Sequence, residues 1–180
     1  MRNVPFLVFP EAFGDDFCDA VIQSASEQQL EPGRTFDDKE GDRNSSVTFL
    51  NPSPSLGFST AIFDLVSHAN MMAFGFDISM CAQLQFTEYT EGQFYAVHAD
   101  ESLIHPKRDS MFDRKLSISI LLVNPLEFSG GDLVIVGEKV ELPRRGSAVV
   151  FPSFLQHEVT PVTSGVRKSL VSWIQGPMWR

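Results

Sequence analysis

The sequence predicts an α+β fold in which N-terminal helices pack against one face of a β-sheet. Two segments with apolar residues at helical spacing precede residue 75, and short runs of strand-forming residues follow it. Turns rich in Gly, Pro or Asn separate most of these runs, as is typical of a sandwich or barrel. The order of helices first and strands afterwards indicates that the helices form a layer of their own.

Length and composition favour one packed domain. The chain has 180 residues, and its hydrophobic share of 43% and charged share of 21% exclude disordered, collagen-like and coiled-coil chains. The 16 phenylalanines predict a sheet-rich core with aromatic packing. We therefore expect a single domain over 1–180, in which 1–75 form a strand-helix support and 82–176 form the sheet core.

The first 75 residues show two helical patterns and two short strand patterns. Gly14 and the two aspartates after it mark a helix start. The elements expected are a strand at 6–9, a helix from 15 to about 29, a strand at 47–50 and a helix at 58–74. Residues 31–46 are polar and acidic and predict a long loop. A solvated loop is the simpler interpretation and a lid over a functional site is the alternative.

The second part of the chain consists of strand patterns. Six strands are expected, at 82–89, 94–99, 116–123, 132–136, 148–151 and 169–174. The second half of 116–123 is apolar on both faces, which is typical of a strand covered on both sides.

Charge and cysteine content narrow the class of protein. The net charge of −9 argues against nucleic-acid binding through a broad basic face, but is compatible with a local pocket for a small anion. Cys18 and Cys81 form no CxxC motif, and we interpret both as small buried residues in a reducing compartment. No apolar run approaches the ~18 residues of a membrane span, and the apolar start is too short for a signal peptide. We expect a cytoplasmic protein with no nucleic-acid or membrane partner.

Three residues have the chemistry of a metal site. His98 and Asp100 are two residues apart in a predicted strand, so their side chains face the same side. The pair carries little weight alone, because a chain with four histidines and 23 acidic residues produces one easily by accident. His157 lies between two later strands, and a second sheet can bring it beside the pair. Two histidines and one carboxylate are the facial triad of non-haem Fe(II) sites, which leaves coordination positions open.

A candidate anion clamp lies at the start of the last strand. Arg167 and Ser169 share one face there. A guanidinium beside a hydroxyl suits bidentate binding of a carboxylate. Taken alone, Arg167 is more simply interpreted as a surface charge, but beside a metal triad the clamp is the stronger interpretation.

Over 82–176, about half of the chain, the sequence resembles the Fe(II)/2-oxoglutarate-dependent dioxygenase superfamily. Within it, the sequence is most similar to the prolyl 4-hydroxylase-like branch of small stand-alone oxygenases. The segments that carry the resemblance are 84–89, 92, 98–100, 116–124, 129–133, 151–152, 157–162 and 165–173. The N-terminal strand and helix and the segment 43–47 also resemble that branch.

The resemblance implies a double-stranded β-helix (jelly-roll) core with the N-terminal helices packed on one sheet. It implies that His98, Asp100 and His157 are the ligands of Fe(II) and belong, with Arg167, to the catalytic residues. Fe(II), 2-oxoglutarate and O2 are the implied cofactors and cosubstrates, and the resemblance is compatible with a need for ascorbate.

The resemblance also assigns the cosubstrate pocket. Arg167 is implied to hold the distal carboxylate of 2-oxoglutarate, helped by Ser169, and Tyr89 matches a tyrosine that lines this pocket. One departure concerns the strand after the His98 motif, where relatives often place a second tyrosine. The segment 120–123 has no hydroxyl here, so we expect the clamp to rest on the other three residues or to be weaker.

The resemblance implies hydroxylation, most plainly of a prolyl or other residue in a peptide or protein. A free amino acid or another small metabolite is the alternative substrate. A jelly-roll binding module without turnover is the alternative from a different functional class, and the presence of all the key residues argues against it.

The charged segment 101–115 follows the metal motif directly and is the candidate substrate lip, with a solvated hairpin tip as the plainer interpretation. It is too charged for a core, and Arg108 and Arg114 are its candidate substrate contacts. His105 lies in the same segment, and we expect it in a loop rather than as a metal ligand. His68 falls in a predicted helix and is expected to be structural or exposed.

Overall fold

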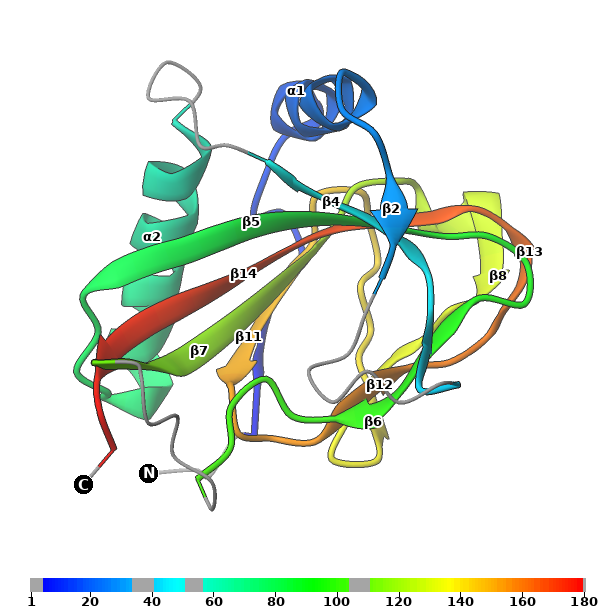
Figure 1. Cartoon of the computed structure of the whole chain (residues 1–180). Helices are drawn as coiled ribbons and strands as arrows, with labels where there is room; N and C mark the ends of the chain where they lie inside the picture. The colour runs from blue at the N-terminus through cyan, green and yellow to red at the C-terminus, as the bar shows by residue number, and fades with distance from the viewer. Residues whose placement is uncertain (1–4, 34–40, 51–56, 104–110, 180) are drawn as a thin grey trace.

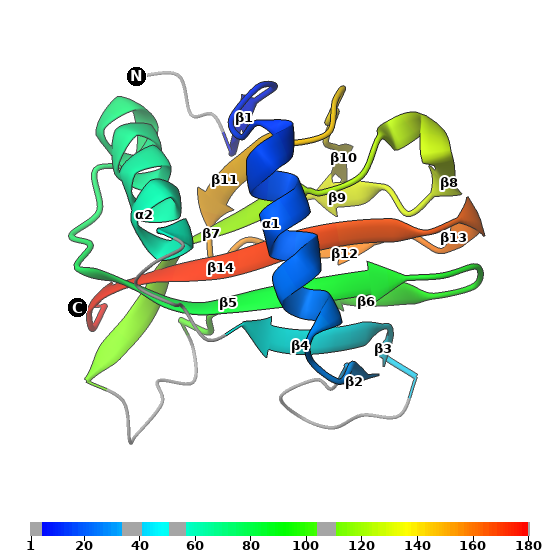
Figure 2. The same cartoon turned by 90° about the horizontal axis from the view of Figure 1, so that it is seen from above.

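Two antiparallel sheets face each other, and two helices cover the outer side of the larger sheet (Figure 1, Figure 2). The computed structural model describes residues 5–33, 41–50, 57–103 and 111–179. The layers are therefore those that the sequence predicts: helices first along the chain, then a sheet pair. Each described helix is 12 residues long or shorter, and none is long and apolar enough to cross a membrane.

The N-terminal part supplies the helices and several edge strands. In order along the chain these are β1 (Leu7–Phe9), α1 (Asp15–Ser26), β2 (Glu31–Pro32), β3 (Arg43–Asn44), β4 (Ser46–Leu50), α2 (Phe58–Ala69) and a π-helical turn (Asn70–Phe74). The prediction of a continuous loop over 31–46 is wrong at both ends, where β2 and β3 lie. Two-residue strands have no periodicity of their own, and they exist because β2 pairs with β4 and β3 pairs with the strand at 94–98.

The C-terminal part supplies most of both sheets. Its elements are β5 (Met80–Tyr89), β6 (Phe94–His98), β7 (Phe112–Leu121), η2 (Pro125–Glu127), β8 (Phe128–Gly130), β9 (Leu133–Ile135), β10 (Glu138–Lys139), β11 (Ala148–Pro152), β12 (His157–Val159), β13 (Val162–Gly165) and β14 (Arg167–Pro177). All six predicted strands are present. The additional strands have two to four residues each, too few for a readable alternation.

The large sheet has the strand order β1-β11-β7-β14-β5-β4-β2, and the small sheet has the order β10-β9-β12-β6-β3. β8 and β13 form a separate two-stranded ribbon. β6 and β12 are adjacent in the small sheet but far apart in sequence, so the metal-site candidates on them become neighbours only in the folded chain.

The two faces of the large sheet bury different side chains. Leu116, Ile118 and Ile120 of β7 are fully buried against the helices, in one cluster with Ile62 and Val66 of α2. The alternate residues of β7 face the small sheet, because side chains alternate along a strand. Those residues include serines, and several other strands of the large sheet also bring buried polar residues to this side. The polar residues Gln85, Thr87, Ser117, Ser119 and Ser169 are all buried there.

The two cysteines of the chain are free thiols. Cys18 is fully buried in the helix layer, and Cys81 is half-buried with its Sγ 2.9 Å from Oγ of Ser172. His68 lies on α2 with its ring 6.5 Å from that of Phe9. His68 is exposed there, in agreement with the expectation that it is structural or exposed.

Candidate metal and cosubstrate site

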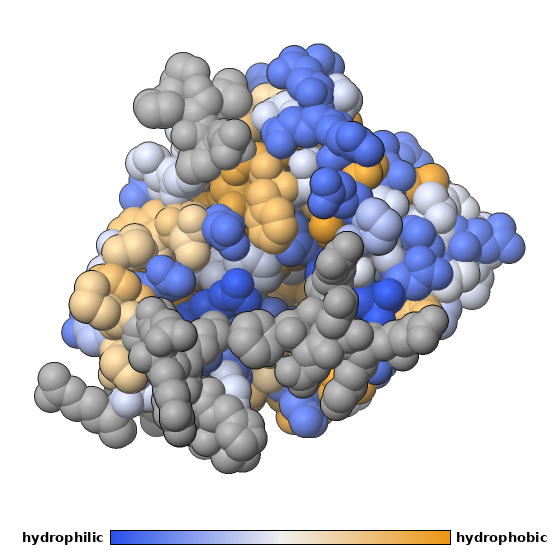
Figure 3. Space-filling view, viewed as in Figure 1, coloured by the Kyte–Doolittle hydropathy of each residue, from blue (hydrophilic) through white to orange (hydrophobic). Residues whose placement is uncertain are grey.

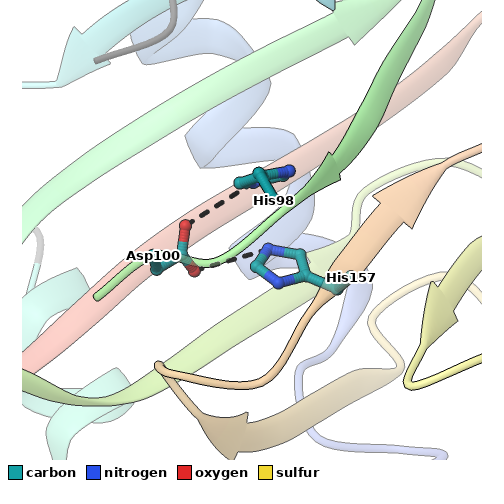
Figure 4. Close-up of side chains that lie close together, drawn as sticks. All are labelled: His98, Asp100 and His157. Carbon is teal, nitrogen blue, oxygen red and sulfur yellow. Dashed lines mark ion pairs between the residues drawn. The ribbon is translucent and has the colours of Figure 1, made fainter. Parts of the chain in front are cut away.

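Three side chains able to bind a metal meet between β6 and β12. His98 ends β6, Asp100 lies two residues beyond it, and His157 begins β12 directly opposite His98. Nε2 of His98 lies 3.7 Å from Oδ1 of Asp100, and Nε2 of His157 lies 3.5 Å from Oδ2 (Figure 4). The ligand atoms of all three residues lie within 4.8 Å of one another, so one cation can contact them all.

Main-chain carbonyls fix the orientation of both imidazole rings. Nδ1 of His98 lies 2.9 Å from the carbonyl oxygen of Ala96, and Nδ1 of His157 lies 3.0 Å from that of Leu155. A carbonyl can only accept, so each Nδ1 carries a proton, and Nε2 is the nitrogen that has a free lone pair in the neutral form of each ring. Both rings therefore offer Nε2 to the space beside Asp100.

The electrostatics of the cluster suit a divalent cation. Burial, reinforced by the charge of His157, lowers the pKa of His98 to about 4 against the opposing effect of Asp100, so this ring is neutral near pH 7. Burial raises the pKa of Asp100, but His157, His98 and the hydrogen bond from Ser117 outweigh it, and the pKa is lowered. Two imidazole nitrogens and one ionised carboxylate are a donor set that fits Fe(II) with open positions.

An aromatic stack covers the outer side of His98. The ring of Tyr95 lies parallel to that of His98 with 3.5 Å between the ring centroids, and Cζ of Arg43 sits 4.4 Å above the Tyr95 ring. The stack restrains His98 from rotating away from Asp100. Tyr95 is not among the site residues predicted from the sequence, although an aromatic residue three positions before His98 is a signal that points to it.

A buried cation lies at the start of β14. Arg167 is 2% exposed, stands opposite Tyr89 of β5, and donates from Nη1 to Oγ of Ser169 at 3.1 Å. Cζ of Arg167 lies 5.6 Å from the centroid of the Tyr89 ring, which is 3% exposed. In the described part of the chain no carboxylate forms an ion pair with Arg167. A buried guanidinium without an anion is costly, so its surroundings fit an anionic ligand.

Gly131 makes room for this arginine. With φ of +62° it adopts a left-handed conformation, and a Cβ at this position would lie 2.9 Å from Val162 and 3.0 Å from Cδ of Arg167. The Gly130–Gly131 pair that contributes to the family resemblance is therefore required by packing as well as by backbone conformation.

The wall beside Arg167 is polar but lacks a second tyrosine. Ser169 stands between Thr87 of β5 and Leu121 of β7 in the register of the large sheet. Nε2 of Gln85 donates to Oγ1 of Thr87 at 3.0 Å. Leu121 thus occupies the side of β7 that faces Ser169, as expected from the absence of a hydroxyl in 120–123. Gln85 and Thr87 are not among the site residues predicted from the sequence, although the alternation of polar residues in β5 points to them.

Residues 84–175, just over half of the chain, match the family model of the 2OG-Fe(II) oxygenase superfamily. The chain belongs to this superfamily. A PKHD-type hydroxylase of Psychrobacter sp. (strain PRwf-1) is 39% identical over 94 residues, which cover 50% of this chain and 36% of that protein. The chain spans 36% to 42% of the length of this and three further PKHD-type hydroxylases.

Solved structures show the fold of this 2OG-Fe(II) oxygenase domain. A viral collagen prolyl hydroxylase from Paramecium Bursaria Chlorella virus-1 superposes with a TM-score of 0.75 at 20% identity, over 96% of this chain and 97% of that one. A prolyl hydroxylase from Trichoplax adhaerens, in complex with a hypoxia inducible factor peptide fragment, gives 0.74 at 17% identity, over 96% and 84%. The predicted double-stranded β-helix is confirmed.

The candidate lip of the oxygenase domain is less loop-like than the sequence suggests. Glu101 is 4% exposed, and its carboxylate accepts from the main-chain nitrogens of Ser102 and Arg114. β7 begins at Phe112, and Lys115 within it is 4% exposed. The expectation that 101–115 is too charged to be buried is therefore wrong at both ends, because main-chain donors satisfy Glu101 and Lys115 packs over an aromatic ring. His105 and Arg108 lie outside the described residues.

Proposed function

We propose that this chain is an Fe(II)- and 2-oxoglutarate-dependent dioxygenase that hydroxylates a prolyl or other residue of a peptide. The single observation that carries this proposal is the His98, Asp100 and His157 cluster, in a chain that belongs to the superfamily. The names of structurally similar proteins support a peptide as the substrate. The viral neighbour is a collagen prolyl hydroxylase, and another neighbour was solved with a peptide fragment. A cytoplasmic location stays a prediction from the sequence.

In this proposal, one end of the site binds the metal and the other end binds the cosubstrate. His98, Asp100 and His157 hold Fe(II), and Arg167 with Ser169 binds the distal carboxylate of 2-oxoglutarate beside Tyr89. When bound, the iron supplies the oxidation in which O2 converts 2-oxoglutarate to succinate and CO2 and places one oxygen atom in a substrate C–H bond. The chain contributes orientation: carbonyl-fixed rings at one end, and a buried fork of donors at the other.

Arg114 is the described residue best placed to contact the substrate. The register of β14 against β7 passes from Leu116 to Arg114 and skips Lys115, which is a β-bulge. A bulge reverses the alternation of a strand and often re-aims a side chain beside a site. Arg114 thereby reaches the face of Trp173, with its Cζ 4.0 Å from the ring centroid, and its Nη1 donates to the main-chain oxygen of Asp100 at 3.3 Å.

Figure 3 shows strongly hydrophilic residues in the middle of one face of the molecule, with apolar residues above and to the left of them. An elongated substrate can use both kinds of surface. We keep 101–115 as the substrate lip, with Arg114 as its anchored part.

The function is tested with a library of proline-containing peptides. Metal-loaded protein, 2-oxoglutarate and O2 are incubated with the library, and mass spectrometry identifies products that gain one oxygen atom while succinate is measured in parallel. The proposal expects equal amounts of succinate and hydroxylated peptide. If only free amino acids or small metabolites stimulate succinate formation, the substrate is one of these and not a peptide. Binding of the cosubstrate without any turnover would favour a non-catalytic module.

Arg114→Ala is expected to lower product formation about 10- to 100-fold, because a hydrogen bond from a charged group is worth ~1.5–3 kcal/mol. Binding of metal and 2-oxoglutarate should stay unchanged, and Arg114→Lys should recover only part of the activity, since an ammonium lacks the planar fork. The measurement pairs product mass spectrometry with binding titrations. Arg144→Ala, an exposed arginine paired with Glu11, is the control. Wild-type product formation in Arg114→Ala would remove this residue from the substrate site.

A further inference from the structure

A chain of two buried hydroxyls ends on one oxygen of Asp100. Oγ of Ser117 donates to Oδ2 of Asp100 at 2.6 Å, and Oγ of Ser153 lies 2.9 Å from Oγ of Ser117. Both serines are fully buried. A hydroxyl has one proton to give, so Ser117 gives its proton to the carboxylate and Ser153 donates to Ser117. Hydrogen bonds in such a directed chain strengthen one another.

The rest of the fold holds both hydroxyls in place. Ser117 lies in the interior of β7, paired with Phe151 of β11 on one side and Trp173 of β14 on the other. Ser153 follows β11 and joins the two sheets: its main-chain nitrogen donates to the carbonyl of Lys115 at 3.0 Å, and its carbonyl accepts from the main-chain nitrogen of Asp100 at 2.9 Å. The donor and the carboxylate are thus fixed to the same framework.

The two carboxylate oxygens of Asp100 differ in the hydrogen bonds that they accept. Each lies near a histidine nitrogen, Oδ1 near His98 and Oδ2 near His157, so the distances to the rings would allow either or both oxygens to reach a shared cation. Oδ2 already accepts the short hydrogen bond from Ser117. In the described part of the chain the Trp173 indole also acts on the Asp100 carboxylate, but its Nε1 makes no hydrogen bond of ordinary geometry. Oδ1 is therefore the oxygen free to bind a metal.

The number of carboxylate oxygens on the metal decides whether O2 can enter. If a metal with six coordination positions were held here, two imidazole nitrogens and two oxygens of a chelating 2-oxo acid would leave two positions. A carboxylate bound through both oxygens would fill them, whereas a carboxylate bound through one leaves a position open.

We propose that Ser117, supported by Ser153, reserves Oδ2 of Asp100 for a hydrogen bond, so that Asp100 binds the metal through Oδ1 alone and a coordination position stays available for O2. This inference rests on the proposed function of the site. It assigns Ser117 and Ser153 as positioning residues, since both act through Asp100 and neither contacts substrate.

The test measures access to the metal without turnover. Protein loaded with Fe(II) and 2-oxoglutarate under anaerobic conditions is titrated with nitric oxide, a stable substitute for O2, and the complex is followed by electron paramagnetic resonance. Ser117→Ala is expected to bind nitric oxide roughly tenfold more weakly, the scale of losing an outer partner of a metal ligand. Ser117→Thr keeps the hydroxyl and should bind as the wild type does. Ser153→Ala should give a smaller loss, and it carries the test if Ser117→Ala does not load metal.

Two controls separate the ways in which the inference can fail. Ser172→Ala removes an equally buried serine on the helix side of β14, where its hydroxyl donates to the carbonyl of Gln83, and should leave nitric oxide binding unchanged. Wild-type affinity in Ser117→Ala, or equal losses in Ser117→Ala and Ser117→Thr, would overturn the inference. Full Fe(II) binding by Asp100→Ala would instead overturn the metal site itself.

Discussion

A His157→Ala variant is expected to bind Fe(II) at least a hundredfold more weakly than the wild-type chain. Loss of an outer partner of a metal ligand costs roughly 10- to 100-fold in affinity, and loss of a ligand itself costs more. In the described part of the chain, His98, Asp100 and His157 are the only residues grouped so that they can hold a metal. No other described side chain can therefore replace the missing nitrogen. Equilibrium titration of Fe(II) under anaerobic conditions, with metal content as a second readout, measures the effect. His98→Ala and Asp100→Ala should behave alike.

Histidines outside the cluster provide matched controls for this prediction. His68→Ala, on α2 in ring contact with Phe9, should bind Fe(II) as the wild type does. His105→Ala should also keep its iron, because the sequence places His105 in a loop. Full Fe(II) binding by His157→Ala, or loss of iron from His105→Ala, would show that the wrong histidine has been assigned.

Arg167→Ala is expected to weaken 2-oxoglutarate binding by roughly tenfold to a thousandfold, while Fe(II) binding changes little. The substitution removes the buried guanidinium that would pair with the distal carboxylate, and losing a partner of a charged buried group costs a few kcal/mol. Arg167→Lys should recover only part of the affinity, because an ammonium is a point charge rather than a planar fork. Calorimetric titration of metal-loaded protein with 2-oxoglutarate measures both variants.

Lys168→Ala is the matched control for Arg167→Ala. Lys168 is the next residue of β14, and its Nζ forms a 3.4 Å ion pair with Glu88 on the neighbouring strand. The loss of this partly exposed cation should leave 2-oxoglutarate binding unchanged. An unaltered titration in Arg167→Ala, or an equal loss in Lys168→Ala, would contradict the role assigned to Arg167.

The longer strands could be predicted from sequence, and the shortest could not. β7 and β14 are ten and eleven residues long, and each overlaps a run of strand-forming residues, 116–123 and 169–174, that predicts a strand without any partner. β2 and β3 have two residues each and are strands only because a neighbouring strand supplies their hydrogen bonds. Pairing of this kind depends on the folded sheet, so the polar segment 31–46 predicts a loop.

Some residues of the candidate site could be predicted from the sequence, whereas the roles of others depend on how the strands pair. His98, Asp100, His157 and Arg167 lie in segments whose residue types and spacing point to their chemistry. The hydroxyl of Ser117 reaches Asp100 through the register of β7, and Arg114 reaches Trp173 through a bulge. Register and bulges follow from how strands pair, which spacing along the chain does not contain.

The central claim is that the metal cluster and Arg167 bind the two ends of one 2-oxo acid. The most direct test is calorimetric titration of 2-oxoglutarate into the protein with and without anaerobic Fe(II), beside glutarate, which has both carboxylates but no ketone. The account predicts that Fe(II) tightens 2-oxoglutarate binding about tenfold or more, within the usual range of coupling between linked sites, and leaves glutarate binding little changed. Equal affinity for 2-oxoglutarate with and without Fe(II), or equal gains for both acids, would contradict it.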